Sequence, residues 1–299
     1  MSLTSVFRSG VVRSGNCLAA TGDVAKNDTS TITTTSGGNT PTTTASRPPT
    51  FRELGMRHGT DKVTHHRYDR FYPREIDHIK PLVGVGMIEI GLFRGASLNV
   101  WLDYLPNAWI YGLDINNEAT GDRVTIVKGD QSVGADLNRL IGALRHPIHF
   151  VNDDGSHVPE HQLFTFRTLF PIVENGGVYI IEDIETGYWT RGGLYGYETR
   201  YGPEHRLNLV NVFGDLVTHY VNREFLTLKA LDRLVSSLVA LGFETAETVD
   251  QTTGQRCVPV LDSVASVTIA HNCVIIRKVD SNEDSNVTSR QPYRGSMYL

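Results

Sequence analysis

The sequence predicts an α/β fold in which a mostly parallel sheet is covered by helices on both faces. From residue 51 onward, short apolar runs alternate with amphipathic segments, a rhythm typical of parallel strands joined by crossover helices. Two further apolar runs follow each other closely near the end of this pattern, which predicts a final strand that is antiparallel to its neighbour. Hydrophobic residues make up 40% of the 299 residues, enough for a sizeable core.

Seven strands and six helices are expected along the chain, and each has a local reason. The strands are short, apolar and rich in β-branched residues: they are predicted at 87–90, 109–113, 124–127, 148–151, 178–181, 266–269 and 273–276. The helices show apolar residues at helical spacing: they are predicted at 74–79, 97–105, 135–144, 161–173, 207–221 and 226–241. Pro81 ends the first helix, and residues 270–272 supply the turn of the final hairpin.

Composition divides the chain into three parts. Residues 1–50 are rich in Thr and Ser and have little to bury, so they are expected to form a disordered extension before a domain at 51–280. A polar tail at 281–299 is also expected to be disordered. Within the extension, residues 1–22 carry arginines among serines and no acid, which is a weak match to an organelle-targeting peptide. An unstructured extension is the preferred interpretation.

Charge and cysteine content exclude several classes of partner. A net charge of −5 gives no electrostatic case for binding nucleic acid or an anionic membrane. No apolar run approaches the roughly 18 residues of a membrane span. The three cysteines have no metal-binding or redox spacing and suit a reducing compartment, so we expect a cytoplasmic protein. The sequence leaves a homo-oligomer open.

Carboxylates gather where two of the expected strands end. One apolar strand runs into Asp153 and Asp154, and the next runs into Glu182 and Asp183. If the strands are neighbours, these like charges repel unless a cation, a shared proton or hydrogen-bond donors offset them. Oxygen ligands suit Mg²⁺, and Mn²⁺ would fit the same set, whereas zinc prefers histidine and cysteine. The alternative is that Asp154 and Asp183 cap the following loops and face water.

His157 follows the first acidic pair and is the candidate general base. Its imidazole can take up a proton near neutral pH, and its place beside the proposed metal site favours this role over that of a surface histidine in a loop.

The earlier strands carry features of a nucleotide-like cofactor site. Residues 89–97 place glycines between a strand and a helix N-terminus, where the backbone can approach a ligand closely. Asp114 ends the next strand and can accept hydrogen bonds from ribose hydroxyls, although an acid there is also common as a turn residue. Residues 129–131 close a third strand and could face an adenine. The carboxyl edge of an open α/β sheet is where such ligands bind.

Together these motifs resemble a known family. The matching segments are Gly59-Thr60-Asp61-Lys62 with His66 and Tyr68, Glu89-x-Gly91-x-x-x-Gly95-x-Ser97, residues 111–115, Gly129-Asp130-Gln131-Ser132, Asp153-Asp154-Gly155-Ser156-His157, residues 176–183, Tyr188-Trp189 and residues 272–278. Over about residues 54–278 the chain resembles class I S-adenosylmethionine-dependent methyltransferases with their Rossmann-like fold. More narrowly, it is similar to the metal-dependent sugar O-methyltransferases of macrolide and rhamnosyl natural-product pathways, of which the mycinamicin enzymes are examples.

The resemblance implies roles for individual residues. Those implied to bind S-adenosylmethionine are Thr60, Lys62, Glu89, Gly91, Gly95, Ser97, Asp114, Asp130, Gln131 and Asp153, with Thr60 and Lys62 closing over it. Asp154 and Asp183 would bind Mg²⁺, with Glu182 as a further candidate ligand, and His157 would be the base. Residues 159–161 and 188–201 depart from the family pattern, so the acceptor is the least transferable feature.

The function expected from this resemblance is O-methylation of a sugar or glycosylated small molecule in secondary metabolism. Mg²⁺ would lower the pKa of a sugar hydroxyl and hold two vicinal oxygens. Tyr188, Trp189, Tyr195 and Tyr197 could form aromatic walls for the acceptor, or could equally be ordinary loop packing. Two rival functions are a nicotinamide oxidoreductase, disfavoured by the absence of a third glycine, and a non-catalytic binding protein that retains the fold.

Overall fold

The structure, a computed structural model, describes residues 47–221, 236–237, 239–240, 248–249, 256–257 and 263–280. Residues 1–46 of the extension expected to be disordered at 1–50, the tail expected to be disordered at 281–299, and most of the helix expected at 226–241 lie outside these described residues. Backbone contacts divide the chain into residues 1–47 and 48–299, and the fold described below is that of the second unit.

The second unit is built on one mixed eight-stranded sheet. Its strands are β1 (Val85–Ile90), β2 (Ala108–Asp114), β3 (Ala119–Gly121), β4 (Val124–Lys128), β5 (Ile148–Asp153), β6 (Val173–Glu182), β11 (Val264–Ala270) and β12 (Cys273–Lys278). Their order is β11-β12-β6-β5-β1-β2-β4-β3. The pairs from β6 through β5, β1 and β2 to β4 are parallel. The β12–β6, β11–β12 and β3–β4 pairs are antiparallel.

The expected mostly parallel sheet and its antiparallel final hairpin are confirmed, but the expected number of seven strands is wrong. The additional strand is β3, a three-residue antiparallel strand at the sheet edge. All three of its residues are exposed, so the strand has no apolar pattern from which it could be predicted.

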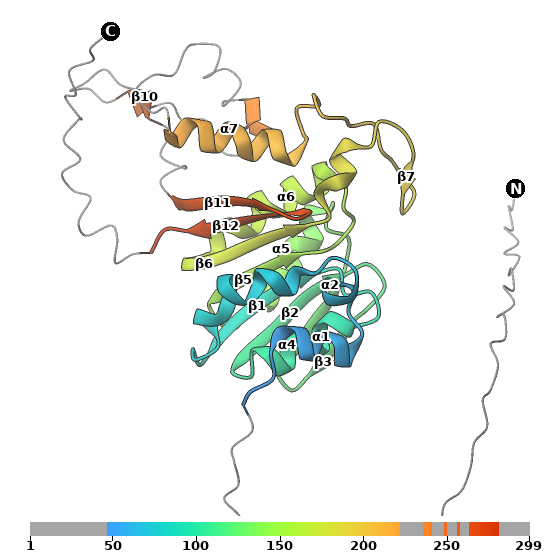
Figure 1. Cartoon of the computed structure of the whole chain (residues 1–299), viewed down its shortest axis with the longest axis vertical. Helices are drawn as coiled ribbons and strands as arrows, with labels where there is room; N and C mark the ends of the chain where they lie inside the picture. The colour runs from blue at the N-terminus through green and yellow to red at the C-terminus, as the bar shows by residue number, and fades with distance from the viewer. Residues whose placement is uncertain are drawn as a thin grey trace, which may run out of the picture. The chain divides into compact units, whose positions relative to one another are not determined.

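Helices cover both faces of the sheet, as expected. They are α1 (Phe51–His58), α2 (Asp61–Thr64), α3 (Tyr72–Ile76), α4 (Ala96–Tyr104), α5 (Gly134–Ala143), α6 (Pro159–Leu169) and α7 (Leu209–Val221). Figure 1 shows α1, α2 and α4 in front of the sheet and α5 and α6 behind it. The front core packs Phe51 and Trp101 onto strand residues such as Ile110, and the rear core packs Phe166 and Phe213 onto residues such as Tyr179.

Short elements complete the fold and refine several predicted boundaries. They are the 3₁₀ turns η1 (Tyr68–Arg70), η2 (Asp77–Ile79), η3 (Phe170–Ile172) and η4 (Ile184–Tyr188), and the strands β7 (Gly193–Leu194), β8 (Tyr197–Glu198), β9 (Thr248–Val249) and β10 (Arg256–Cys257). The helix expected at 74–79 is α3 followed by η2, and the helix expected at 161–173 ends as η3 before β6 begins. Helices α1 and α2 precede the first expected helix and were not predicted.

Helix α1 matters to the site because of where it ends. Thr50 and Glu53 form a reciprocal capping box at its N-terminus, and Gly59 ends it in a left-handed conformation with φ of 72°. The chain then turns directly into Thr60 and α2, which carries Lys62 into the interior. None of the helices that the structure describes combines the length and apolar character needed to cross a bilayer.

Candidate functional site

The parallel strands β1, β5 and β6 bring their acidic ends to one edge of the sheet. In the register of the strands, Glu89 lies opposite Asn152, and Asp153 lies opposite Ile181. The strand that leads to Asp153 and Asp154 is therefore a neighbour of the strand that leads to Glu182, which is the condition under which the sequence predicts repulsion between these acids.

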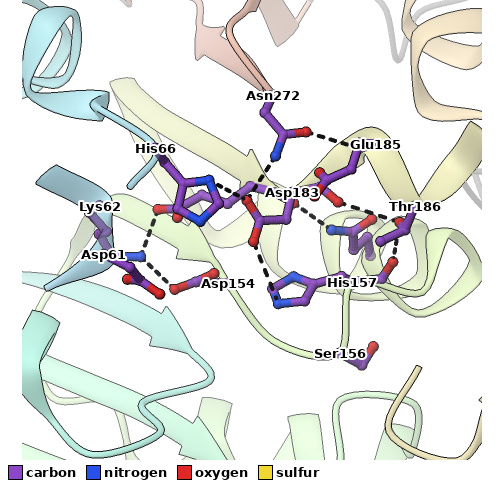
Figure 2. Close-up of polar contacts among 12 residues, drawn as sticks. Asp61, Lys62, His66, Asp154, Ser156, His157, Asp183, Glu185, Thr186 and Asn272 are labelled. Carbon is purple, nitrogen blue, oxygen red and sulfur yellow. Dashed lines mark hydrogen bonds and ion pairs between the residues drawn. The ribbon is translucent and has the colours of Figure 1, made fainter. Parts of the chain in front are cut away.

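Asp154, His157 and Asp183 form a group that could hold a metal ion. One ligand atom from each residue lies within 4.8 Å of the other two, and the three side chains are 20%, 12% and 15% exposed. His157 and Asp183 have left-handed backbone conformations with φ of 56° and 54°, which are uncommon for residues with a Cβ and cluster at functional sites. In Figure 2 both His66 and His157 point toward Asp183.

The two oxygens of Asp183 have different surroundings. Oδ1 accepts hydrogen bonds from the Tyr68 hydroxyl at 2.8 Å and from Asn272 Nδ2 at 3.0 Å, and His66 Nδ1 lies 3.3 Å away. Oδ2 lies 3.8 Å from His157 Nε2. Burial raises the pKa of Asp183, and His157 partly opposes that shift. Oδ1 is thus held by hydrogen bonds within the protein, while Oδ2 is the oxygen of Asp183 that faces His157.

Lys62 is a buried cation between the carboxylates. Its Nζ donates to Asp154 Oδ2 at 2.6 Å and to Glu182 Oε1 at 2.8 Å, and lies 3.8 Å from Glu89 Oε1. Burial alone would lower the pKa of Lys62, but Asp154 and Glu182 outweigh it and raise the pKa well above its usual value. Lys62 is therefore charged and offsets the repulsion among the acids.

Glu182 is held by donors from three parts of the chain. In addition to Lys62, its Oε1 accepts from the Tyr72 hydroxyl at 2.5 Å and from Asn152 Nδ2 at 2.7 Å. Burial and the charge of Asp154 raise its pKa. The structure places Glu182 beside Lys62 and outside the group of three, so its role as a metal ligand stays a prediction.

Glu89 and Gly91 lie at the expected cofactor side of the edge. Glu89 Oε1 accepts from Trp101 Nε1 at 3.0 Å, whereas Oε2 is buried and has no hydrogen-bond partner among the described residues. Burial raises the pKa of Glu89 to about 7. Gly91 has φ of 78°, and a Cβ there would lie 2.3 Å from the Asp154 carbonyl oxygen. A glycine is therefore required at position 91, where the loop after β1 meets the loop after β5. The nearby Glu89 Oε2 is a buried acceptor that a donor group of a ligand could satisfy.

Asp114 organises the glycine loop. Its Oδ2 accepts from the backbone N–H groups of Leu92 and Phe93, and its Oδ1 accepts from those of Asn116 and Asn117. Burial would raise the pKa of Asp114, but these four bonds lower it overall. This is the behaviour of a turn acid, the alternative that the sequence left open, and a contact with ribose stays a prediction.

Gln131 connects the end of β4 to the loop that carries Asp154 and His157. Its Nε2 donates to Asp153 Oδ1 at 3.1 Å, and its Oε1 accepts from the Ser156 backbone N–H at 2.6 Å. Asp153 is fully buried, and burial raises its pKa to about 8. Asp130 accepts a hydrogen bond from the Tyr197 hydroxyl at 3.2 Å. Both Gln131 and Asp153 thus support the backbone of the loop that carries Asp154 and His157.

The remaining predicted residues lie on the helix starts that border this edge. Gly95 is the left-handed N-cap of α4, and Ser97 is buried in the first turn of that helix. Thr60 is the buried N-cap of α2, directly before Lys62. Free N–H groups at such positions can meet an anionic or polar ligand group.

The donor set fits a hard divalent cation. Two carboxylates and one imidazole, each partly exposed, leave coordination positions open, and carboxylate oxygens suit Mg²⁺. The cofactor side is also consistent with a ligand, because the buried Glu89 Oε2 is an acceptor that a cationic ligand group would satisfy.

Several residues that build this site were not predicted from the sequence. Tyr72 and Asn152 hold Glu182, Trp101 holds Glu89, and the Thr186 hydroxyl donates to the His157 carbonyl oxygen at 2.5 Å. Asn152 precedes the acidic pair and is fully buried. A polar residue inside an apolar strand must find a buried hydrogen-bond partner, and this feature of the sequence could have pointed to Asn152.

Several known proteins are similar to this chain in sequence. No model of a protein family matches the chain. It is 35% identical over 202 residues to 8-demethyl-8-alpha-L-rhamnosyl tetracenomycin-C 2'-O-methyltransferase of Streptomyces olivaceus, which covers 64% of this chain and 52% of that protein. It is 39% identical over 155 residues to mycinamicin VI 2''-O-methyltransferase of Micromonospora griseorubida, which covers 48% of this chain and 38% of that protein. The chain thus spans about half the length of the first of these relatives and less than half of the second.

Solved structures show the same fold. MycE methyltransferase from the mycinamycin pathway, in complex with Mg and SAH, superposes with a TM-score of 0.64 at 24% identity, over 85% of this chain and 59% of that chain. Its complex with Mg, SAH and mycinamycin VI gives a TM-score of 0.61 at 26% identity, over 80% and 55% of the two chains. The chain is therefore similar, over part of their length, to sugar O-methyltransferases of macrolide and tetracenomycin pathways, and it has the Rossmann-like fold of class I methyltransferases.

Proposed function

We propose that this protein transfers a methyl group from S-adenosylmethionine to a hydroxyl of a sugar or glycosylated small molecule, with the help of Mg²⁺. The observation that carries the proposal is the group Asp154, His157 and Asp183, which lies at the same sheet edge as the buried Glu89 and the Gly91 turn. The relatives support the same chemistry, since those compared above are named as O-methyltransferases of a rhamnosyl tetracenomycin C and of mycinamicin VI, and MycE forms a complex with Mg and SAH.

Asp154 and Asp183 would hold the cation through the oxygens that face the group of three. When bound, the cation would supply positive charge that lowers the pKa of an acceptor hydroxyl. Asp183 is suited to this task because Tyr68 and Asn272 fix its other oxygen and so orient the carboxylate. Lys62 would keep Asp154 in place through its 2.6 Å hydrogen bond.

His157 would take the proton of the acceptor hydroxyl at Nε2. That nitrogen faces Asp183, whereas Nδ1 is buried without a hydrogen-bond partner among the described residues. The Thr186 hydroxyl, which donates to the His157 carbonyl oxygen, holds the backbone of this residue in its left-handed conformation. An imidazole takes up a proton near neutral pH, as a general base for an alcohol requires.

The cofactor would lie along the ends of β1, β2 and β4. Glu89 Oε2 would accept a hydrogen bond from a cationic group, and Gly91 would let the backbone approach the ligand. Asp114, Asp130 and Gln131 follow in order along the same edge, the usual ligand-binding edge of an open α/β sheet.

The experiment is a methyl-transfer assay on the full chain with S-adenosylmethionine, Mg²⁺ and a panel of glycosides, followed by mass spectrometry. We expect one methyl group to be added to at least one glycoside, EDTA to abolish turnover, and Mg²⁺ to restore it. Full activity in a metal-free sample would contradict the role of the cation.

Calorimetry separates the rival functions. We expect binding of S-adenosylhomocysteine and none of NAD, because the glycine loop lacks the third glycine of a dinucleotide motif. Binding of NAD in its place would favour an oxidoreductase. Binding of S-adenosylhomocysteine without transfer to any acceptor of a broad panel would favour a non-catalytic protein.

A further inference from the structure

The short hairpin of β7 and β8 carries a tyrosine at a position that suits other residues better. Tyr195 and Gly196 form its two-residue turn, with φ of 50° and 91°. Positive φ at both central positions is the mark of a type I′ turn, which favours Asn-Gly or Gly-Gly. A large side chain in this conformation is strained, and such strain is typical of functional positions.

The hairpin is tied to the loop that carries the candidate catalytic residues. The Tyr197 hydroxyl donates to Asp130 Oδ2 at 3.2 Å, and its ring meets the His161 ring edge-on at 4.6 Å between centroids. His161 Nδ1 in turn lies 2.9 Å from the Ser156 hydroxyl, next to His157 in the chain. In Figure 1 this hairpin is the yellow segment labelled β7. Its turn therefore has a defined position relative to the site.

Tyr195 stands beside the proposed base and remains open to solvent. Its ring centroid lies 6.1 Å from that of His157, and the residue is 73% exposed. Partial burial and the charges of Asp154, Asp183 and Asp61 raise the pKa of its hydroxyl. The ring thus lies next to the candidate metal group and presents apolar surface that a ligand could cover.

We propose that Tyr195 is a stacking platform for the pyranose ring of the acceptor, and this inference rests on the proposed function. The C–H face of a pyranose is apolar and weakly positive, so it is attracted to the negative face of an aromatic ring. A pyranoside seated on Tyr195 would present hydroxyls at its edge to His157 and to the carboxylates of Asp154 and Asp183. The acceptor class is therefore a pyranoside, and Tyr195 acts by positioning it.

Tyr188 marks an alternative place where the sugar of the acceptor could bind. It is 44% exposed and lines a cavity of about 600 Å³ together with His66 and Asn272. These two residues contact Asp183 Oδ1, whereas the proposed base faces Oδ2. A sugar in this cavity would lie on the other side of the Asp183 carboxylate from His157.

The test measures binding of two pyranosides to the full chain in the presence of Mg²⁺ and S-adenosylhomocysteine. The probes are 8-demethyl-8-alpha-L-rhamnosyl tetracenomycin C and mycinamicin VI, the compounds after which the relatives are named. Tyr195→Asn removes the ring but creates an Asn-Gly turn, which keeps the hairpin folded. Tyr195→Phe keeps the ring and removes the hydroxyl. Binding of S-adenosylhomocysteine confirms that each variant is folded.

We expect Tyr195→Asn to raise the Kd of at least one pyranoside by between about twofold and tenfold, the usual worth of an aromatic stacking contact. Tyr195→Phe should stay within about twofold of the wild type. Saturation-transfer NMR should show contact with the C–H face of the sugar in the wild type and in Tyr195→Phe, and loss of that contact in Tyr195→Asn.

Three results would overturn the inference. They are an unchanged Kd in Tyr195→Asn, weaker binding in Tyr188→Ala in place of Tyr195→Asn, and no pyranoside binding by the wild type. Each leaves the proposed function standing if the wild type still binds S-adenosylhomocysteine and methylates another acceptor. The proposed function fails separately, when the wild type transfers no methyl group to any acceptor of the panel.

Discussion

At the scale of single residues, the site depends on groups that the fold holds in unusual states. Asp183 and His157 have left-handed backbones, and Glu89 and Asp153 are carboxyls whose pKa values burial raises to about 7 and about 8. Such backbone strain and burial both cost folding free energy. Their concentration at one sheet edge is what distinguishes a candidate site from ordinary loop acids.

Replacing His157 tests its role as a base against a role as the third metal ligand. We expect His157→Ala to cut kcat at least about a hundredfold, the usual scale of a lost general base, while the affinities for S-adenosylhomocysteine and Mg²⁺ stay unchanged. Steady-state kinetics and calorimetry provide the measurements. Loss of Mg²⁺ binding would show that the imidazole is a ligand, as its place in the group of three permits.

Glu89 should make stability depend on pH. Its pKa rises from 4.5 to about 7 on folding, so between these values the native state keeps a proton that the unfolded chain has lost. Stability should therefore fall as pH rises through this window, with a slope approaching about 1.4 kcal/mol per pH unit from this group alone. Urea unfolding of Glu89→Gln without ligands should show a flatter profile from pH 4.5 to 7.

The control for this prediction is Glu118→Gln, which alters an exposed carboxyl. It should keep the wild-type profile. A Glu89→Gln profile as steep as the wild type would show that other groups cause the pH dependence.

At the scale of elements, α1 and α2 deliver a buried cation to the sheet edge. The capping box begins α1, Gly59 ends it, and the next turn places Lys62 against carboxylates at the ends of β5 and β6. The β7–β8 hairpin places Tyr195 beside His157, and the hydrogen bond from Tyr197 to Asp130 holds the hairpin in position. Neither element belongs to the sheet, yet both determine what surrounds Asp154.

Thr50→Ala should destabilise the protein by about 1 kcal/mol, because it removes the N-cap hydrogen bond of α1. Chemical denaturation would measure this change. Thr50→Ser keeps the capping hydroxyl and should stay close to the wild type. Equal stability of the alanine variant and the wild type would show that packing of Phe51 and Leu54 alone holds the helix.

At the scale of the whole molecule, parallel strand order is what assembles the site. Residues from β1, β5, β6 and the β11–β12 turn meet because these strands stand side by side in the sheet. A cation bound there would link several strand ends, so binding should stabilise the entire second unit by mass action.

We therefore expect Mg²⁺ at about a hundred times its Kd to stabilise the protein by about 2.7 kcal/mol, which is roughly 5–10 °C in Tm for a domain of this size. Thermal unfolding with Mg²⁺ or EDTA is the measurement. Asp154→Asn should lose the Mg²⁺-dependent shift, whereas Asp122→Asn, an exposed change, should keep it. A shift of equal size in both variants would place the ion elsewhere.

Local pattern was sufficient to predict much of this fold. Apolar runs such as residues 178–181 locate strands because a buried strand must be apolar along its own length. The exposed three-residue β3 has no such pattern and was missed. Pairs distant in sequence, such as Lys62 with Glu182 or Tyr72 with Glu182, were also missed, because no local rule connects residues more than a hundred positions apart.

By itself the sequence determined which chemical groups reach the carboxyl edge of the sheet, because strand ends and the residues after them follow from local apolar patterns. Only the tertiary structure decided how the adjacent Glu182 and Asp183 divide their roles. Glu182 ends β6 and lies buried against Lys62, while Asp183 has a left-handed backbone conformation and faces His157. The physical reason is that neighbouring residues of a chain leave a strand in different directions, and packing decides which partner each one meets.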